Sequence, residues 1–278
     1  MAYLLLVPLL YAAQSLFARA VQRAQLNLYA VGAVTYVCSA MIYAGRLARH
    51  QTAPEAVVVA GGIVLGALFA ATYLVFVPTL ADRGVSVMAA MCQLSALIPM
   101  VASLTIWHEH PTAVRLTGAV LCLIAMPMLA LDKGVTDTHL TPRKVLLFLG
   151  MIVLNGGVLV CLKWFDEQDA DPQFDGFMLV TFAVAAVVMA GLWPVYRGRL
   201  SRGVLGWGAA TSVVYAGASL MIVQALKTYD GAVVFPFAEA TALAMTVGYA
   251  AVFWREIPGR VGLAGIGLVT VAAVLVNL

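Results

Sequence analysis

Two stretches of sequence decide the fold: WHEHPTAVRLTGAVLCLIA at residues 107–125 and WREIPGRVGLAGIGLVTVA at residues 254–272. They align without a gap at an offset of 147 residues (254 − 107) and are identical at eight of nineteen positions. Chance similarity between apolar segments explains matched leucines and alanines, but not a matched Trp, Glu, Pro and Gly. The identical pairs are Trp107/Trp254, Glu109/Glu256, Pro111/Pro258, Val114/Val261, Leu116/Leu263, Gly118/Gly265, Leu121/Leu268 and Ala125/Ala272.

The same offset extends upstream of these stretches. It needs no gap from residue 70 to residue 129, and it pairs Gly84 with Gly231 at the start of the preceding apolar segment. The chain therefore divides into two related halves, residues 1–132 and 143–278. A polar connector with turn-forming residues, 133–142, joins them.

Composition sets the environment of both halves. The chain has 278 residues, of which 63% are hydrophobic and only 10% are charged, which is typical of an integral membrane protein. Apolar runs of about twenty residues recur, and a helix of that length crosses the core of a bilayer. Ten such spans leave no room for a soluble enzymatic domain. We expect them at 2–21, 27–46, 56–80, 86–107, 112–131, 143–164, 176–196, 203–226, 231–254 and 259–277.

Each half holds five expected spans. An odd number means that the second half enters the bilayer from the opposite face, and inverted-topology repeats of this kind are typical of secondary transporters. The predicted fold is an all-α integral membrane protein of ten transmembrane helices, arranged as two inverted-topology five-helix repeats.

The fourth span of each half ends in an acidic turn, TIWHEHP (105–111) and VFWREIP (252–258), and the next span has a spaced Gly among small and aliphatic residues. These features resemble the drug/metabolite transporter superfamily, in its ten-helix EamA branch, over essentially the full length. The resemblance implies a secondary transporter of a bacterial inner membrane, with export of amino acids or similar metabolites as the commonest role. Family members often carry a Glu-Pro pair in the ninth helix, where this chain has Ala242 and Leu243.

Glu239 lies one turn before that position, well inside the span 231–254. An ionised carboxylate there costs at least about 2.5 kcal/mol, so such a residue faces the interior of the bundle or a water-filled cavity. Pro236 removes a backbone hydrogen bond and predicts a local break in the helix. We expect Glu239 to bind a cationic group of a substrate or a coupling proton; the alternative is a structural hydrogen bond to a neighbouring Ser, Tyr or Gln.

Other polar side chains lie at comparable depth. Tyr11 and Gln14 share a helical face, as do Tyr215 and Ser219, and a polar stripe in a span must avoid lipid. Each such residue either lines a cavity or forms a hydrogen bond between helices. The offset also places Gln93 over Ala240, beside Glu239. The candidate substrate- or proton-binding residues are Glu239, Gln93, Gln14, Tyr11, Tyr73, Asn155, Tyr215 and Ser219; Ser15, Tyr36 and Gln224 are further polar residues at this depth.

The repeated acids Glu109 and Glu256 stand at helix ends just before a proline, which is typical of capping and predicts a structural role in the hairpin. His108 and His110 flank Glu109 at a spacing of two, whereas metal ligands on one helical face need a spacing of four. We therefore expect no metal site.

The segment DEQDADPQFD (166–175) holds five acids but lacks the Gly and the Glu that a calcium loop requires at its positions 6 and 12. It is predicted to be a solvated loop. Lys163 and Trp164 precede it at an expected membrane boundary, where Lys snorkels to water and Trp anchors. No GxxxxGK[ST] phosphate loop is present, so energy would come from an ion or substrate gradient.

The sequence thus predicts a transporter that moves a small polar or amphipathic metabolite, such as an amino acid, a sugar or a drug-like molecule, by alternating access. Export and proton coupling are part of this hypothesis, and the protein is expected as a monomer or homodimer without cofactors. The spans hold no convergent nucleophile–base pair, which argues against an enzyme, and a net charge of +3 is too small to indicate nucleic acid. A lipid flippase or scramblase is the alternative.

Two indications of orientation disagree. The connectors after the odd-numbered spans carry eleven of the sixteen Lys and Arg residues, and the positive-inside rule would put both termini outside. The family resemblance implies cytoplasmic termini. The eleven residues are Arg19, Arg23, Arg83, Lys133, Arg143, Lys144, Arg197, Arg199, Arg202, Arg255 and Arg260.

Overall fold

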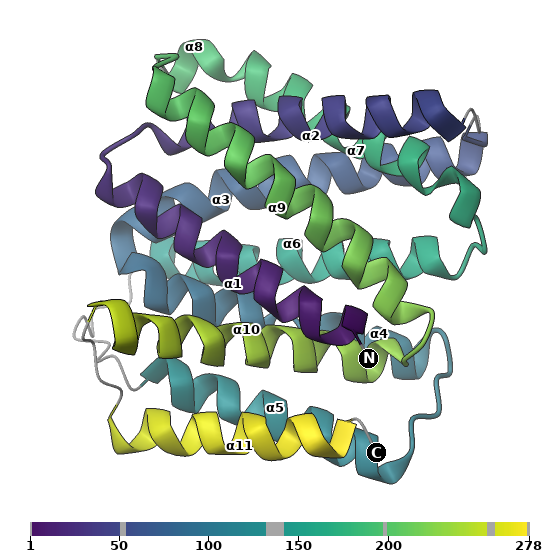
Figure 1. The fold of residues 1–278 in the computed structure, drawn as a ribbon, viewed down its shortest axis with the longest axis vertical. Coiled ribbons are helices and arrows are strands. Elements are labelled where there is room, and N and C mark those ends of the chain that lie inside the picture. Colours follow the sequence, from purple (N-terminus) through teal and green to yellow (C-terminus); the bar gives the residue numbers. More distant parts are fainter. Residues whose placement is uncertain (1, 51–53, 132–141, 197–198, 255–258, 277–278) are drawn as a thin grey trace.

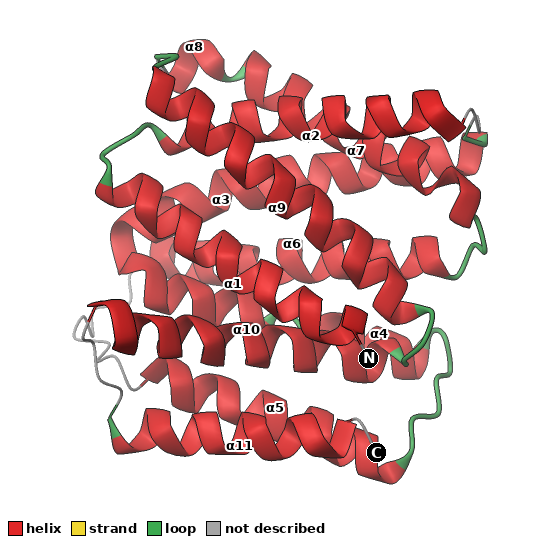
Figure 2. Ribbon diagram, viewed as in Figure 1, coloured by secondary structure: helices red, strands yellow, loops and turns green. Residues whose placement is uncertain are grey.

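The computed structural model describes residues 2–50, 54–131, 142–196, 199–254 and 259–276, and every regular element in these ranges is helical (Figures 1 and 2). The expected linker therefore lies outside the described residues, except for Pro142. The elements are α1 (Ala2–Arg23), α2 (Leu28–His50), α3 (Ala56–Leu94), α4 (Leu97–Thr105), α5 (Ala113–Leu131), α6 (Pro142–Asp166), the 3-10 helix η1 (Asp171–Gln173), α7 (Phe174–Gly191), α8 (Trp193–Tyr196), α9 (Arg202–Leu226), α10 (Gly231–Trp254) and α11 (Arg260–Val276).

The helices follow the hydropathy pattern closely. Over the described residues, seven helices are long and apolar enough to cross a membrane, and two shorter apolar helices lie at Ala113–Leu129 and Arg260–Val276. Large hydrophobic side chains such as Leu146, Val187 and Val252 are also exposed on the outside of the bundle, as lipid contact requires. The chain is therefore an α-helical integral membrane protein.

The structure corrects the bounds of the third and fourth expected spans, 56–80 and 86–107. The connector expected between the spans 56–80 and 86–107 is helical, α3 continues to Leu94, and the helix ends instead at Ser95 and Ala96, before α4. A straight helix of 39 residues would be about 58 Å long, roughly twice the thickness of a bilayer core. The ribbon of α3 instead changes direction at the left of Figure 1, and the helix packs against α6 and α7 and also against α5 and α10. Gly84 lies inside this helix and does not end it, because one glycine weakens a helix by only about 1 kcal/mol.

The break predicted at Pro236 is also wrong. Helix α10 is continuous from Gly231 to Trp254 with Pro236 inside it. Proline at the sixth position of a helix removes one backbone hydrogen bond, to the carbonyl of Ala232, and the bonds around it still form.

Helices from the two halves pack against one another throughout the bundle. Helix α1 packs on α9 and α10, α2 on α7 and α9, α3 on α6 and α7, and α5 on α11. In Figure 1, α5 and α11 lie together at the bottom of the view, and α2 and α7 at the top. The interface between the halves is therefore also the core of the molecule.

The matched glycines of the repeat lie at the α5–α11 contact. A Cβ added at Gly118 would stand 2.8 Å from Val276 Cγ2, and one added at Gly265 would stand 2.9 Å from Leu129 Cγ. Both distances are shorter than real Cβ contacts, so the two helices approach closely only because both residues are glycine.

Candidate functional site

A cavity of about 170 Å³ lies between the two halves. Helices α1, α2 and α3 line it from the first half, and α6, α9 and α10 line it from the second. Seven of the eight residues selected from the sequence line this one cavity, although they come from five different helices. They are Tyr11, Gln14, Tyr73, Asn155, Tyr215, Ser219 and Glu239. The eighth, Gln93, lies in α3, but its side chain is outside the part of the chain whose side chains the structure describes.

Helical periodicity explains why these residues meet. On α9, Thr211, Tyr215, Ser219 and Ile222 follow one another at intervals of three or four residues and all line the cavity. Such residues share one helical face. Gln14 and Ser15 follow Tyr11 on α1 in the same way, so each polar stripe avoids lipid by facing the cavity.

Glu239 is the single carboxylate among the described lining residues. It is 7% exposed, and within the described part of the chain it forms no hydrogen bond and no ion pair. The structural hydrogen bond to a neighbouring Ser, Tyr or Gln is therefore not formed among those residues. The hydroxyl of Thr72, which also lines the cavity, is likewise buried without a partner. Buried polar groups are normally satisfied, so the unpaired hydroxyl of Thr72 and the unpaired carboxylate of Glu239 give this cavity two polar groups that a ligand can engage.

Aromatic rings form a second part of the lining. The ring centroid of Tyr36 lies 6.2 Å from that of Phe69, 5.8 Å from Tyr73 and 6.4 Å from Tyr215, and Tyr73 stacks on Phe76 at 5.6 Å. We call these five residues the aromatic wall. The phenol of Tyr36 donates to the Phe69 carbonyl at 3.2 Å, and that of Tyr73 donates to the Leu28 carbonyl at 2.8 Å. Sequence analysis missed Phe69 and Phe76, because an aromatic residue in an apolar span is indistinguishable from ordinary core.

The lining runs from the buried side chains of Leu159, Leu162 and Ile222 at its inner end toward the opposite face of the bundle. Ala18 and Val21 near the end of α1, Leu28 at the start of α2 and Ala242 on α10 belong to it. We call the end where α1 ends and α2 begins the near face, and the opposite end, where α6 ends and α10 begins, the far face. The cavity therefore reaches toward the near face.

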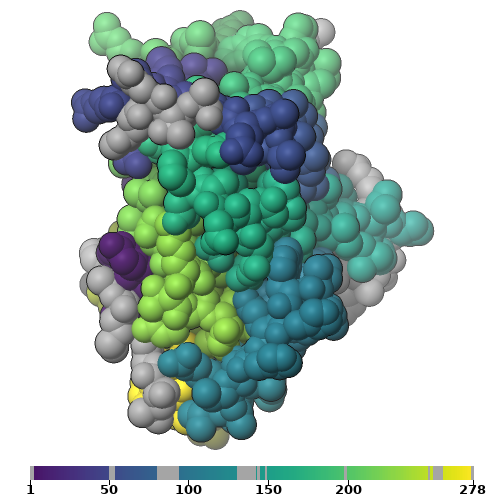
Figure 3. Space-filling model, turned by 90° about the vertical axis from the view of Figure 1, so that its right-hand side faces the viewer, coloured from purple at the N-terminus to yellow at the C-terminus, as the bar shows by residue number. Residues whose placement is uncertain are grey.

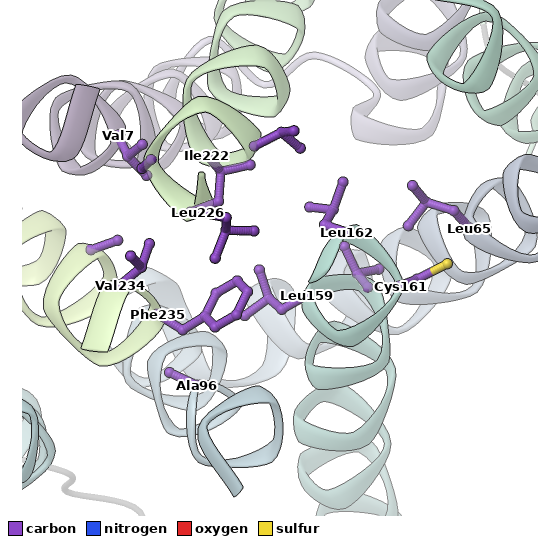
Figure 4. Packing of buried hydrophobic residues seen from close by; sticks show 14 of the residues in the cluster. Val7, Leu65, Ala96, Leu159, Cys161, Leu162, Ile222, Leu226, Val234 and Phe235 are labelled. Carbon is purple, nitrogen blue, oxygen red and sulfur yellow. The ribbon is translucent and has the colours of Figure 1, made fainter. Parts of the chain in front are cut away.

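Apolar side chains close the cavity toward the far face. Figure 4 shows Leu159, Leu226 and Phe235 directed toward one another, with Leu162 and Ile222 beside them. All five are buried at 5% exposure or less. Figure 3 looks onto the far face, where the region of the end of α9 and the start of α10, in yellow-green, lies beside the region of the α6–α7 connection, in teal-green. We call these five residues the apolar plug.

Beyond the plug lies a cluster of charges around the buried Lys163. Lys163 Nζ is 2.9 Å from Glu109 Oε1, 3.3 Å from Asp166 Oδ2 and 2.5 Å from Glu167 Oε1. The Lys163 side chain is only 5% exposed, so it does not snorkel to water as predicted. Trp164 next to it packs its ring against Gly61 of α3 and is not a free anchor. Glu109 from the first half and Asp166 and Glu167 from the second half keep Lys163 inside the protein. The sequence around Lys163 did not reveal Glu109 as its partner, because Glu109 belongs to the other half.

Glu109 acts as a cap, but for a different helix from the one predicted. Its Oε1 and Oε2 accept hydrogen bonds from the backbone N–H groups of Gly231 and Ala232, both at 2.9 Å, at the start of α10. Burial raises the pKa of Glu109, but the hydrogen bonds from these amides and from Lys163 outweigh burial and hold it below its ordinary value. The matching Glu256 lies outside the described residues.

The acidic segment 166–175 is only in part the solvated loop that was predicted, because residues 167–169, 171 and 172 are exposed whereas Ala170, Phe174 and Asp175 are buried. Asp175 Oδ1 pairs with Arg46 Nε at 2.7 Å, and Asp171 Oδ2 pairs with Lys227 Nζ at 2.6 Å. With Asp166 and Glu167 bound to Lys163, four of its five acids form ion pairs, because the segment packs over the ends of other helices. In the described part of the chain, no three His, Cys, Asp or Glu side chains are grouped to hold a metal ion, and His108 and His110 lie in the α4–α5 connection.

Comparisons with known proteins provide a structure of similar fold but no information on function. No protein-family profile matches the chain, and no curated protein matches it. A solved structure described only as "Crystal structure of protein" aligns over 99% of this chain and 94% of its own, with a TM-score of 0.76 and 16% sequence identity. The chain therefore shares a full-length fold with a known structure.

Proposed function

We propose that this protein is a ten-helix secondary transporter that moves a small polar or amphipathic metabolite by alternating access. The observation that carries the proposal is the cavity between the halves, in which a buried carboxylate, Glu239, has no partner among the described residues. Carriers place their substrate at such an interface between repeats, near the middle of the membrane. Membership of the drug/metabolite transporter superfamily, export and a bacterial inner membrane belong to the same proposal, on the resemblance of the two acidic turns.

The pairs of packed helices support the inverted repeat. If α1, α2 and α3 correspond to α6, α7 and α9, the contact of α3 with α6 corresponds to that of α9 with α1. In the same way, α3 with α7 corresponds to α9 with α2. If α4 likewise corresponds to α10, the contact of α4 with α6 corresponds to that of α10 with α1. The reciprocal glycines Gly118 and Gly265, 147 residues apart, add a pair at the level of single residues.

The two ends of the cavity support alternating access. The lining extends toward the near face, whereas the apolar plug and the Lys163 cluster close the far face. This arrangement corresponds to one of the two end states of a carrier. Transport requires a second state, in which the plug and the ion pairs separate and the near face closes.

Proton coupling through Glu239 completes the proposal. A carboxylate that no neighbour compensates can hold either a proton or a cationic group, so its occupancy can change during the cycle. The other titratable groups that line the cavity are the phenols of Tyr11, Tyr36, Tyr73 and Tyr215.

The experiment is a flux assay on the full chain in liposomes. Amino acids, sugars and cationic drugs are screened with the wild type and with Glu239→Gln while internal pH and solute uptake are recorded. Solute-dependent proton flux that disappears in the variant supports antiport. Solute flux that is the same in both proteins removes Glu239 from the mechanism. Movement of a labelled lipid without solute flux would replace the proposal with a flippase or scramblase.

A further inference from the structure

We propose that the cavity is selective for a small organic monocation, which Glu239 and the aromatic wall bind together. This inference rests on the proposed function, because it names the class of solute that the same cavity would carry. It differs from what the family resemblance implies, since amino acids are zwitterions.

The charge of the lining is the first argument. Among the described residues around the cavity there is one carboxylate, Glu239, and no Lys, Arg or His. An anion, or the carboxylate of a zwitterion, would meet no opposite charge there, and burying an unpaired charge is costly. A monocation would instead neutralise Glu239.

The hydrogen-bonding state of the lining hydroxyls points the same way. The hydroxyls of Ser15 and Thr211 donate to the carbonyls of Tyr11 and Trp207 one turn earlier, at 3.3 and 2.7 Å. The phenols of Tyr36 and Tyr73 also donate to backbone carbonyls. A hydroxyl has one proton to donate, so these four groups offer a ligand only oxygen lone pairs. An ammonium group is a donor without acceptors, which matches them.

The aromatic wall supplies the second half of the site. Tyr36, Phe69, Tyr73, Phe76 and Tyr215 line the same cavity as Glu239 and contact one another through their rings. The face of an aromatic ring attracts an ammonium group within about 6 Å, and more strongly where water is excluded. These rings also accept the apolar body of an amine.

The size of the cavity limits the cation. A volume of about 170 Å³ is below the range of roughly 300–1,000 Å³ that is typical of sites for drug-sized ligands. The ligand is therefore a compact soluble amine and not a lipid whose headgroup carries an amine.

The test uses four solutes that share one body and differ in charge: tyramine (monocation), tyrosol (neutral), tyrosine (zwitterion) and 4-hydroxyphenylacetate (anion). Choline serves as a second monocation. Binding to the purified full chain is measured by calorimetry at neutral pH, in a detergent without choline. Glu239→Gln is the test variant. Asp171→Asn is the matched control, because it removes an acid that is half exposed, pairs with Lys227 and lies outside the cavity.

We expect tyramine to bind at least about tenfold more tightly than tyrosol, tyrosine or 4-hydroxyphenylacetate, as a charge-assisted contact predicts. Glu239→Gln should abolish this preference without changing the binding of tyrosol, and Asp171→Asn should retain it. Equal binding of tyrosine or 4-hydroxyphenylacetate overturns the proposal, as does a preference that survives in Glu239→Gln or the absence of binding by both tyramine and choline.

Liposome flux separates this inference from the proposed function. If tyramine binds with the expected preference but does not cross the membrane, the proposed cation site is supported and the proposed transport function is rejected. If tyrosol and tyrosine are transported as fast as tyramine, the proposed transport function is supported and the proposed cation selectivity is rejected. Labelled phosphatidylethanolamine that moves in place of soluble tyramine assigns the amine to a lipid headgroup and overturns the proposal.

Discussion

Two buried carboxylates of this protein have opposite surroundings. Glu109 accepts hydrogen bonds from two backbone amides and pairs with Lys163, whereas Glu239 has no such partner in the described part of the chain. Both are shielded from solvent, so desolvation penalises both charges. The protein compensates the charge that joins its two halves and leaves uncompensated the one that faces the cavity. The presence or absence of partners therefore distinguishes the structural acid from the acid proposed to bind a ligand more clearly than depth in the membrane does.

The largest effect on stability is expected from removing Lys163. Lys163→Met leaves Glu109 and Asp166 buried without their cation, and breaking a buried pair in this way typically costs about 3–5 kcal/mol. Melting in detergent should show the loss. The double variant Lys163→Met/Glu109→Gln should recover part of it, while Glu167→Gln should cost little, because its side chain is 37% exposed. A single Lys163→Met variant that melts like the wild type would show that the cluster contributes nothing.

A smaller loss is expected where the two halves touch through glycine. Gly265→Leu places its side chain against Leu129 and Met128, and overpacking of this kind costs about 1–3 kcal/mol. Gly267→Leu is the matched control, because nothing in the described structure lies within 4 Å of a Cβ added there. The two variants change helix propensity equally. Equal melting temperatures would mean that α5 and α11 do not pack through Gly265.

Glu239→Gln tests the comparison directly and should have almost no effect on stability. No partner loses its bond when this charge is removed, so the free energy of unfolding should stay within about 1 kcal/mol of the wild type or rise. Glu109→Gln, the same chemical change at the compensated acid, should be clearly destabilising. If the two substitutions destabilise equally, the distinction between the acids fails.

The smallest expected effect is on pH dependence. Because the folded-state pKa of Glu109 is below its ordinary value of about 4.5, its contribution to stability is fully present above that value and is lost as pH falls through the folded pKa. The difference in melting temperature between the wild type and Glu109→Gln should therefore be constant at neutral pH and shrink only under acidic conditions. A difference that grows on acidification would contradict the sign of the shift.

The residues of the cavity were accessible to sequence reasoning because a polar side chain has few reasons to stand inside an apolar span. Tyr11, Asn155 and Glu239 were selected on that ground alone, and one cavity brings them together. The helices followed from hydropathy and length. Their bounds differ from those expected mainly in α3, where the connector expected between the spans 56–80 and 86–107 is helical.

The Lys163 cluster could not be predicted in the same way. A lysine at the end of an apolar span looks the same whether it reaches water or a buried acid, and here the deciding acid, Glu109, belongs to the other half of the chain. The aromatic wall was hidden for a related reason, since Phe69 and Phe76 fit a lipid-facing or core position equally well. In both cases the role of the residue depends on its neighbours in the folded structure, and a local sequence pattern does not contain them.

The cap on α10 also gives the molecule a mechanical link. Glu109 holds the first two amides of the helix, and Glu239 follows eight residues after Gly231, about 12 Å further along the axis. A continuous helix is stiff over that length. Whatever displaces the α4–α5 turn at the far face therefore shifts the height of the carboxylate in the cavity, and a ligand that pulls on Glu239 pushes back on that turn. The short α4–α5 connection at the surface is therefore mechanically coupled, through α10, to the carboxylate that lines the cavity.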